Sequence, residues 1–263
     1  MPELEIPQFN ADPPSEAQLA QWHAQMIDKG YIVIRDALPK ATAEHFRNRI
    51  KDLPDHPYYG STSLVRLFEL GMDFVALMEN QPVFALAERL FGTRMHLIAM
   101  QGHRMFRGNE ITTFHSDEIY LQRPEGVSDD VEYPPIINVI NCHYYMVDVP
   151  IELGPTEVVP GSHRACRGPR PSDGDPPRWR GQSHVSLTCN AGDCIVYSNQ
   201  MWHRGGKNST DRTRVSVVPS YSHRFVAQRF WPFLNYNLSR EILDRCTPRQ
   251  RELLGEHPRG AYG

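Results

Sequence analysis

The stretch "AGDCIVYSNQMWHRGGKNSTDRTRVSV" (residues 191–217) decides which kind of fold this chain can adopt. It runs from a turn into a β-branched segment and through a second turn to His203. A Gly-Gly loop then leads into another extended segment, which carries Arg214. Short apolar segments bounded by Gly, Asn and Asp are typical of the strands of a sandwich or barrel. The stretch therefore predicts two strands of a β core, with a histidine on the connection between them.

The same pattern extends over the second part of the chain, from Gly92 onward. Further short β-like runs, separated by Gly, Pro, Asn and Asp clusters, are "RMHLIAMQ", "HRMFR", "INVINCHYYMVDV", "TEVVP" and "HVSLTC". Several strands at this spacing predict a mainly β core over about residues 93–225.

Helical patterns flank this core. Leu19, Trp22 and Met26 recur at helical spacing within residues 15–29, and Gly30 stands where a C-terminal cap is expected. A strand is predicted in "YIVIRDAL" (31–38). Further helices are predicted over roughly 41–51, over 73–91 with Pro82 as a break or first-turn residue, and over 238–254 with Thr247 and Pro248 starting its final part.

The chain shows no internal repeat and no linker. We therefore expect a single domain over residues 1–263, with a helical N-terminal flank over about 1–92 and a C-terminal helical extension over 226–263.

Composition restricts the class of protein. The net charge of −3 gives no general attraction for nucleic acid or for an anionic membrane, and no apolar stretch approaches the length of a membrane span. The polar, Pro-rich start is not a signal peptide, and the five cysteines form no C-x-x-C pair. These features predict a cytoplasmic protein that acts on a small free metabolite, such as a natural-product intermediate; none indicates an oligomeric state.

The segment "FHSDEIY" (114–120) places a histidine two residues before an aspartate. If the segment is extended, His115 and Asp117 lie on the same face, because side chains alternate along a strand. Taken alone, the motif is equally a polar pair on an edge strand. His203 adds a second histidine, and two histidines with one carboxylate form the ligand set of non-haem Fe(II) oxygenases.

Arg214 follows His203 by eleven residues, on the next predicted strand. Its guanidinium could bind one end of a dicarboxylate through two parallel hydrogen bonds. Ser216 is two residues further on, on the same face, and could donate another hydrogen bond.

Several of these motifs occur together and in order: "GYIVIRDAL", "HSD", "LGPTEVVPGSH" (153–163), "AGDCIVYSNQMWHRGGKN" and "DRTRVSV". From about Gly30 to Tyr221 the chain resembles the phytanoyl-CoA dioxygenase-like family of Fe(II)/2-oxoglutarate-dependent oxygenases. The resemblance implies a double-stranded β-helix core, the cupin-like jelly roll, flanked by helices.

The resemblance also implies roles for individual residues. His115, Asp117 and His203 would be the iron ligands, and Arg214 would bind the far carboxylate of 2-oxoglutarate, with Thr156 as a further co-substrate contact. Some relatives carry a serine two residues after the second histidine, where this chain has Gly205. Ser216 could replace the missing bond. Asp117 argues against the halogenase relatives, which have a small residue at that position.

The implied reaction consumes O₂ and 2-oxoglutarate and oxidises a small molecule, most simply by hydroxylation, with release of succinate and CO₂. Desaturation and ring formation are alternatives. Two other functions remain open: a non-oxidative metal-dependent enzyme of cupin type, and a small-molecule-binding barrel without activity.

Some residues have two interpretations. His103, Arg104 and Tyr120 could contact the substrate or simply pack on strands. His143 and Tyr145 are expected to pack, and His163 is expected to brace a turn. The arginine-rich segment 164–182 is expected to be a solvated loop, with a lid over an anionic substrate as the alternative.

Overall fold

The structure is a computed structural model that describes residues 6–57, 62–111, 113–119 and 121–257. It is mainly β, with two antiparallel sheets. The larger sheet has the order β1-β7-β4-β9-β3-β2 and the smaller one the order β6-β5-β8. The strands are β1 (Tyr31–Ile34), β2 (Ser63–Val65), β3 (His96–Met105), β4 (Val139–Tyr145), β5 (Thr156–Val158), β6 (Val185–Leu187), β7 (Cys194–Ser198), β8 (His203–Gly205) and β9 (Arg214–Ser222).

Strand alternation gives the large sheet two different faces. Cys142 and Tyr144 of β4, with Val215 and Val217 of β9, belong to the main hydrophobic core that the helices cover. The residues between them point the other way and line a cavity; on these two strands they are Asn141, His143, Tyr145, Arg214, Ser216, Val218 and Ser220. The central strands thus have the main hydrophobic core on one side and the polar cavity on the other.

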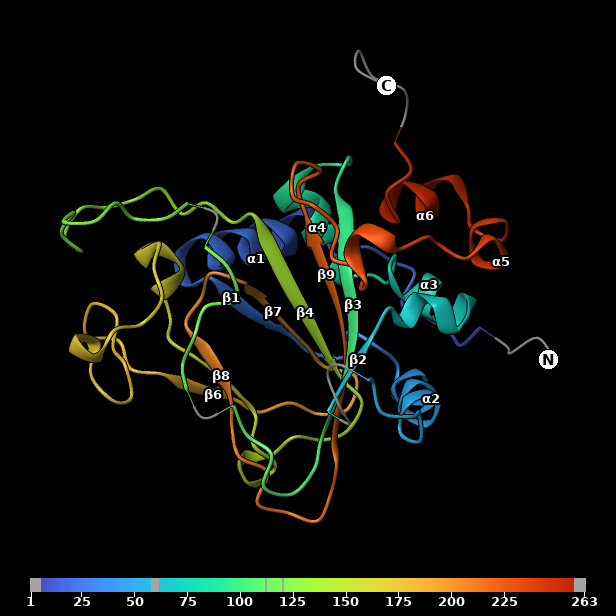
Figure 1. The fold of residues 1–263 in the computed structure, drawn as a ribbon, viewed down its shortest axis with the longest axis horizontal. Coiled ribbons are helices and arrows are strands. Elements are labelled where there is room, and N and C mark those ends of the chain that lie inside the picture. Colours follow the sequence, from blue (N-terminus) through green and yellow to red (C-terminus); the bar gives the residue numbers. More distant parts are fainter. Residues whose placement is uncertain (1–5, 58–61, 112, 120, 258–263) are drawn as a thin grey trace.

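Helices surround the large sheet. They are α1 (Glu16–Lys29), α2 (Lys40–Ile50), α3 (Met72–Leu77), α4 (Val83–Phe91), α5 (Arg240–Leu243) and α6 (Pro248–Leu253). Helices α2, α3, α5 and α6 gather on the side of β2 and β3, whereas β6 and β8 lie on the opposite side with the long loops (Figure 1). Among the described residues, no helix combines the length and the apolarity needed to cross a bilayer.

The first predicted helix is confirmed in detail. The Ser15 hydroxyl accepts a hydrogen bond from the Gln18 amide, and Gly30 ends α1 in the left-handed region with φ 79°. A side chain at Gly30 would also collide with His163, since an ideal Cβ would lie 2.4 Å from its Nδ1. Glycine is therefore required here for its backbone conformation and for the space that it leaves.

Other predictions are corrected. The helix predicted over 73–91 is divided into α3 and α4 at Pro82, and the one over 238–254 is reduced to α5 and α6, with Thr247 capping the latter. The two runs after Gly92 form one strand, β3, with an irregularity between Leu97 and Ala99. The sequence did not predict the short strands β2 and β8.

Candidate metal centre

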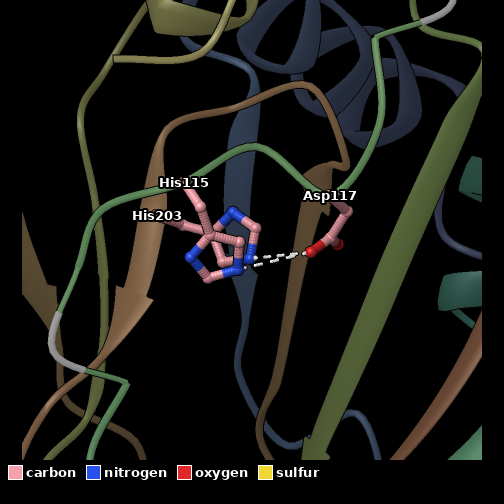
Figure 2. A group of neighbouring side chains, drawn as sticks. All are labelled: His115, Asp117 and His203. Atoms are coloured by element: carbon pink, nitrogen blue, oxygen red, sulfur yellow. Dashed lines mark ion pairs between the residues drawn. The ribbon is translucent and has the colours of Figure 1, made fainter. Parts of the chain in front are cut away.

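The "HSD" segment belongs to none of the named strands and is held by a single bridge. His115 forms an isolated antiparallel bridge with His203, the first residue of β8. The two backbones exchange hydrogen bonds of 3.0 Å and 2.9 Å, and the centres of the two imidazole rings lie 4.4 Å apart. This backbone pairing brings together two histidines that are far apart in sequence (Figure 2).

Asp117 completes the group. Its backbone N–H donates to the Asn199 carbonyl at 3.0 Å, which turns its carboxylate toward the histidines. Oδ1 of Asp117 lies 3.5 Å from Nε2 of His115 and 3.5 Å from Nε2 of His203. The three candidate ligand atoms lie within 4.8 Å of one another (Figure 2). Two imidazoles and one carboxylate on one side of a common point suit Fe(II), since open positions remain for other ligands.

Hydrogen bonds determine how each side chain points. Nδ1 of His115 lies 3.1 Å from the Thr113 carbonyl, and Nδ1 of His203 lies 2.9 Å from the Met201 carbonyl. A carbonyl can only accept, so each Nδ1–H donates and each Nε2 keeps its lone pair for a metal. This is the protonation pattern that a histidine ligand needs.

The carboxylate is fixed from its other side. Nδ2 of Asn141 donates to Oδ2 of Asp117 at 2.7 Å, and Oγ of Ser220 donates to Oδ1 of Asn141 at 2.7 Å. The hydroxyl thereby determines which end of the amide faces Asp117. The sequence analysis did not identify Asn141 or Ser220. The available signal was a polar residue within the apolar run "INVINCHYY", on the same strand face as His143 and Tyr145.

The charges in the site suit a cation. Burial raises the pKa of Asp117, but the neighbouring His203 and His115 and the hydrogen bond from Asn141 outweigh it, so the pKa lies well below its ordinary value. Burial lowers the pKa of His203. The neighbouring Asp117 raises the pKa of His115. Asp117 is therefore ionised and His203 neutral at neutral pH, as ligation requires.

These side chains line a cavity of about 500 Å³. Arg214 reaches into the same cavity from β9 and is only 6% exposed. Its Nη1 is buried and has no hydrogen-bond partner among the described residues. A buried cation with an unused donor is costly unless an anion completes it. The structure therefore offers a place for a carboxylate beside the candidate metal ligands.

Two other predicted co-substrate residues line the same cavity as Arg214. Thr156 lines the cavity from β5, and its hydroxyl lies 2.7 Å from the Tyr145 hydroxyl. Ser216 lines it from β9, in register with Tyr145 on β4. Gly205 faces Arg214 so closely that an ideal Cβ would lie 3.2 Å from Nη2 of the arginine. A serine at position 205 would therefore press against the guanidinium.

The predicted substrate residues have different positions. His103 lines the cavity and stacks on His143, with ring centres 5.8 Å apart. Burial, reinforced by the charge of Arg214, lowers the pKa of His103 to about 4, so this ring is neutral at pH 7. Tyr120 lies outside the described residues.

The prediction for Arg104 is wrong. Arg104 is adjacent to His103 on β3 and therefore points to the opposite face of the sheet, away from the cavity lining. Its Nη1 donates to the Leu53 carbonyl at 2.6 Å and to the Lys51 carbonyl at 3.2 Å. The side chain anchors the chain that follows α2 and cannot contact a substrate in the cavity.

One wall of the cavity comes from the predicted C-terminal helical extension. Arg229, Phe230, Trp231 and Phe233 line the cavity although no α-helix includes them. The Arg229 amide donates to the Ile98 carbonyl at 2.7 Å, and its guanidinium forms an ion pair with Glu118. The aromatic run "RFWPF" was the signal for this wall, and the sequence analysis passed over it.

The loop 164–182 contributes no residue to the described cavity lining. Arg170, Arg178 and Arg180 are exposed, as expected of a solvated loop, but Arg167 is buried. His163 is also buried, with Nε2 3.2 Å from the Ile27 carbonyl of α1, and it is not part of the described cavity lining.

Comparisons with known proteins identify the family of the chain. The family model "Phytanoyl-CoA dioxygenase (PhyH)" matches residues 27–216. The dioxygenase af480 of Aspergillus fumigatus is 25% identical over 248 residues, which cover 88% of this chain and 75% of that protein.

Two solved structures have the same fold. The α-ketoglutarate-dependent epimerase SnoN from nogalamycin biosynthesis superposes with a TM-score of 0.61 at 20% identity, covering 80% of this chain and 85% of that one. HygX from Streptomyces hygroscopicus, with nickel and 2-oxoglutarate bound, gives a TM-score of 0.64 at 16% identity, covering 82% and 89%. The likeness confirms the predicted jelly-roll core. The chain belongs to the phytanoyl-CoA dioxygenase family of iron- and 2-oxoglutarate-dependent dioxygenases.

Proposed function

We propose that His115, Asp117 and His203 hold Fe(II), that Arg214 binds the far carboxylate of 2-oxoglutarate, and that the protein hydroxylates a small metabolite. The observation that carries this proposal is the pairing of two features in one cavity. Three metal-ligand atoms converge on one of its walls, and the buried guanidinium of Arg214 reaches into the same cavity with an unused donor.

When bound, iron and 2-oxoglutarate supply the oxidising chemistry: O₂ provides the oxygen atom of a new hydroxyl group, and 2-oxoglutarate becomes succinate and CO₂. The chain binds and orients. Arg214 gives two parallel donors to the far carboxylate, and the hydroxyls of Thr156 and Ser216 are further donors on the same cavity wall.

The rest of the cavity limits what reaches the metal. Phe230, Trp231 and Phe233 form an apolar wall that keeps water away from the reacting groups. The ion pair between Arg229 and Glu118 joins this wall to the segment that carries Asp117. We infer that the substrate lies against this wall, with the carbon to be oxidised pointing toward the three ligands.

The size of the cavity supports a small-molecule substrate, since about 500 Å³ lies within the range of ligand pockets in general. Related folds also support it, because SnoN has been solved with nogalamycin RO and HygX with hygromycin B. We propose a metabolite of the natural-product class and, by their chemistry, keep desaturation and ring closure as alternatives to hydroxylation.

The test is an anaerobic titration of the apo-protein with Fe(II) and then 2-oxoglutarate, which follows the weak visible charge-transfer band of the chelate. We expect the band in the wild type and in His163→Gln, a buried histidine outside the cavity, and its absence in Asp117→Ala. In Arg214→Met the band should need far more 2-oxoglutarate. Folded protein that binds metal but forms no band would contradict the proposal. It would point to a non-oxidative cupin-type enzyme if zinc or manganese is present on purification, and otherwise to a binding protein.

A further inference from the structure

A small hydrophobic cluster lies behind the two histidines. Its buried members are Phe114, Val159, Ala165, Trp179 and Trp202. Phe114 directly precedes His115, and Trp202 directly precedes His203. Neighbouring side chains along a paired backbone point to opposite sides, so the two aromatic rings lie on the side away from the metal. Trp202 is completely buried. The position of each histidine therefore depends on how its neighbouring ring is packed.

Arg167 packs against two aromatic rings of this cluster. Its guanidinium carbon lies 5.0 Å from the centre of the Trp202 ring and 5.7 Å from that of Trp179. The indole Nε1 of Trp202 donates to the Arg167 carbonyl at 2.7 Å, and the Trp202 amide donates to Oγ of Ser162 at 2.8 Å. The ring that precedes His203 is thus fixed by one hydrogen bond and by contact with a cation.

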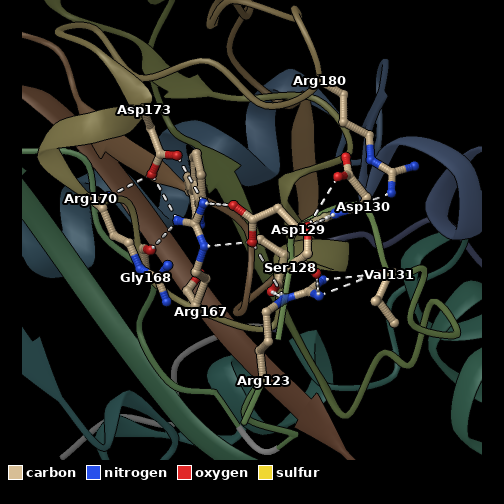
Figure 3. A network of polar contacts seen from close by, with 12 residues as sticks. Arg123, Ser128, Asp129, Asp130, Val131, Arg167, Gly168, Arg170, Asp173 and Arg180 are labelled. Atoms are coloured by element: carbon tan, nitrogen blue, oxygen red, sulfur yellow. Dashed lines mark hydrogen bonds and ion pairs between the residues drawn. The ribbon is translucent and has the colours of Figure 1, made fainter. Parts of the chain in front are cut away.

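Two carboxylates hold the guanidinium in place (Figure 3). Nε of Arg167 donates to Asp129 at 3.1 Å, and Nη1 and Nη2 each donate to Asp173 at 2.8 Å. Nη2 donates to Asp129 as well, and Nη1 also donates to the Gly168 carbonyl at 2.9 Å. All five N–H groups of the guanidinium therefore have acceptors, although the side chain is only 6% exposed.

The same network reaches the segment that follows Asp117. Asp129 belongs to this segment, and so does Arg123, whose side chain is buried. The Arg123 amide donates to the Cys166 carbonyl at 2.8 Å, and its Nε donates to the Ala165 carbonyl at 3.0 Å. Two aspartates balance the charge of the two buried guanidinium groups, and one of these carboxylates, Asp129, also reaches solvent.

We propose that Arg167 is a positioning residue for the metal centre, which supports the His115–His203 pair from behind and joins it to the segment after Asp117. The inference rests on the proposed function, because it takes these three residues as the ligands. The proposal also gives the loop 164–182 a role, because this loop contains Arg167 and would support the metal ligands from the side away from the metal. Residues that hold metal ligands in place from outside typically change metal affinity about 10- to 100-fold when replaced.

The test is a titration of the full-length apo-protein with Co(II), followed by its visible absorption bands, together with the thermal unfolding of each apo variant. We expect Arg167→Met to bind Co(II) up to about 10-fold more weakly than the wild type, with altered band intensities, because Arg167 acts on His203 through Trp202 and is not itself bonded to a ligand. Arg167→Lys should recover only part of the affinity, since an ammonium cannot bind two carboxylates side by side. Arg178→Met is the matched control: it is an exposed arginine of the same loop, its side chain donates to the Gly181 carbonyl, and its loss should not affect Co(II) binding.

A purely structural role gives a different result. If Arg167→Met unfolds at a lower temperature but binds Co(II) as the wild type does, while both are folded, the inference is overturned. If Arg167→Met does not fold, Arg167→Lys and Trp202→Phe decide. The phenylalanine keeps a ring but loses the bond to the Arg167 carbonyl, and wild-type Co(II) affinity in both variants would again overturn the inference. His115→Ala tests the proposed function separately, since unchanged Co(II) binding there would reject the ligand assignment itself.

Discussion

Asn141 donates a 2.7 Å hydrogen bond to Oδ2 of Asp117, the carboxylate oxygen opposite the one that lies 3.5 Å from both histidine Nε2 atoms. One oxygen of Asp117 thus faces the candidate metal position, and the other is held by the sheet. A carboxylate held in this way cannot rotate freely, which prepares it for a ligand.

Replacing this amide should weaken metal binding without removing a ligand. We expect Asn141→Ala to raise the dissociation constant for Fe(II) by about 10- to 100-fold, measured by anaerobic titration. Ser220→Ala should have a smaller effect, because Ser220 contacts Asn141 and not the carboxylate. A larger effect in Ser220→Ala than in Asn141→Ala would show that the amide does not orient Asp117.

Arg214→Met should weaken 2-oxoglutarate binding without lowering the stability of the apo-protein. Truncating one partner of a buried charge pair costs about 2–5 kcal/mol, so the KM for 2-oxoglutarate should rise at least about 30-fold. The apo-protein should unfold at the same or a higher temperature, because methionine removes a buried charge whose Nη1 is unpartnered. A strongly destabilised apo variant would mean that Arg214 is a structural residue.

Gly205 is the position where some relatives carry serine. We expect Gly205→Ser and Gly205→Ala to weaken 2-oxoglutarate binding to a similar degree, and less than Arg214→Met does. The Cβ atom common to both would already lie 3.2 Å from Nη2 of Arg214 and would displace the guanidinium by a few tenths of an ångström. The measurement is the KM for 2-oxoglutarate. Tighter binding in the serine variant would contradict this steric argument.

Buried histidines should make the protein less stable in mild acid. Burial lowers the pKa of His103 and of His163 to about 4 in the folded chain, below the ordinary value of 6.5. The unfolded chain therefore binds more protons between these values, and the free energy of unfolding rises with pH. This stability is complete above about pH 6.5 and is lost as the pH falls toward 4.

Urea unfolding of the apo-protein at several pH values between 7.5 and 4.5 measures this dependence. His163→Gln should flatten it in part, because one of the histidines with a lowered pKa is removed. An unchanged slope in that variant would show that His163 does not supply the protons taken up on unfolding.

The sequence named the three candidate ligands from two short motifs taken together, and the structure brings their side chains into one group. It also predicted α1 with its end at Gly30, because these signals lie in neighbouring residues. Arg214 and Ser216 were proposed from their place on the next predicted strand and Thr156 from the family resemblance, and all three line the cavity.

The parts of the site that the sequence did not predict depend on which residues of distant segments lie opposite one another. The bond from Asn141 to Asp117 and the bridge from His115 to His203 exist only once β4, β8 and the "HSD" segment are side by side. Strand β8 has three residues, too few for a periodic signal. The mistake on Arg104 was avoidable, since neighbouring side chains in a regular part of a strand point to opposite faces, and His103 faces the cavity.

The aromatic wall at Arg229–Phe233 lies beyond the part of the chain, residues 27–216, that matches the family. The residues proposed to bind iron and 2-oxoglutarate lie within that part. Under the proposed function, the reaction chemistry and this part of the substrate contact are thus encoded in separate stretches of the gene, so that evolution can alter one while the other stays constant. Exchanging this short C-terminal segment between relatives, and measuring which molecule is oxidised, follows the same division.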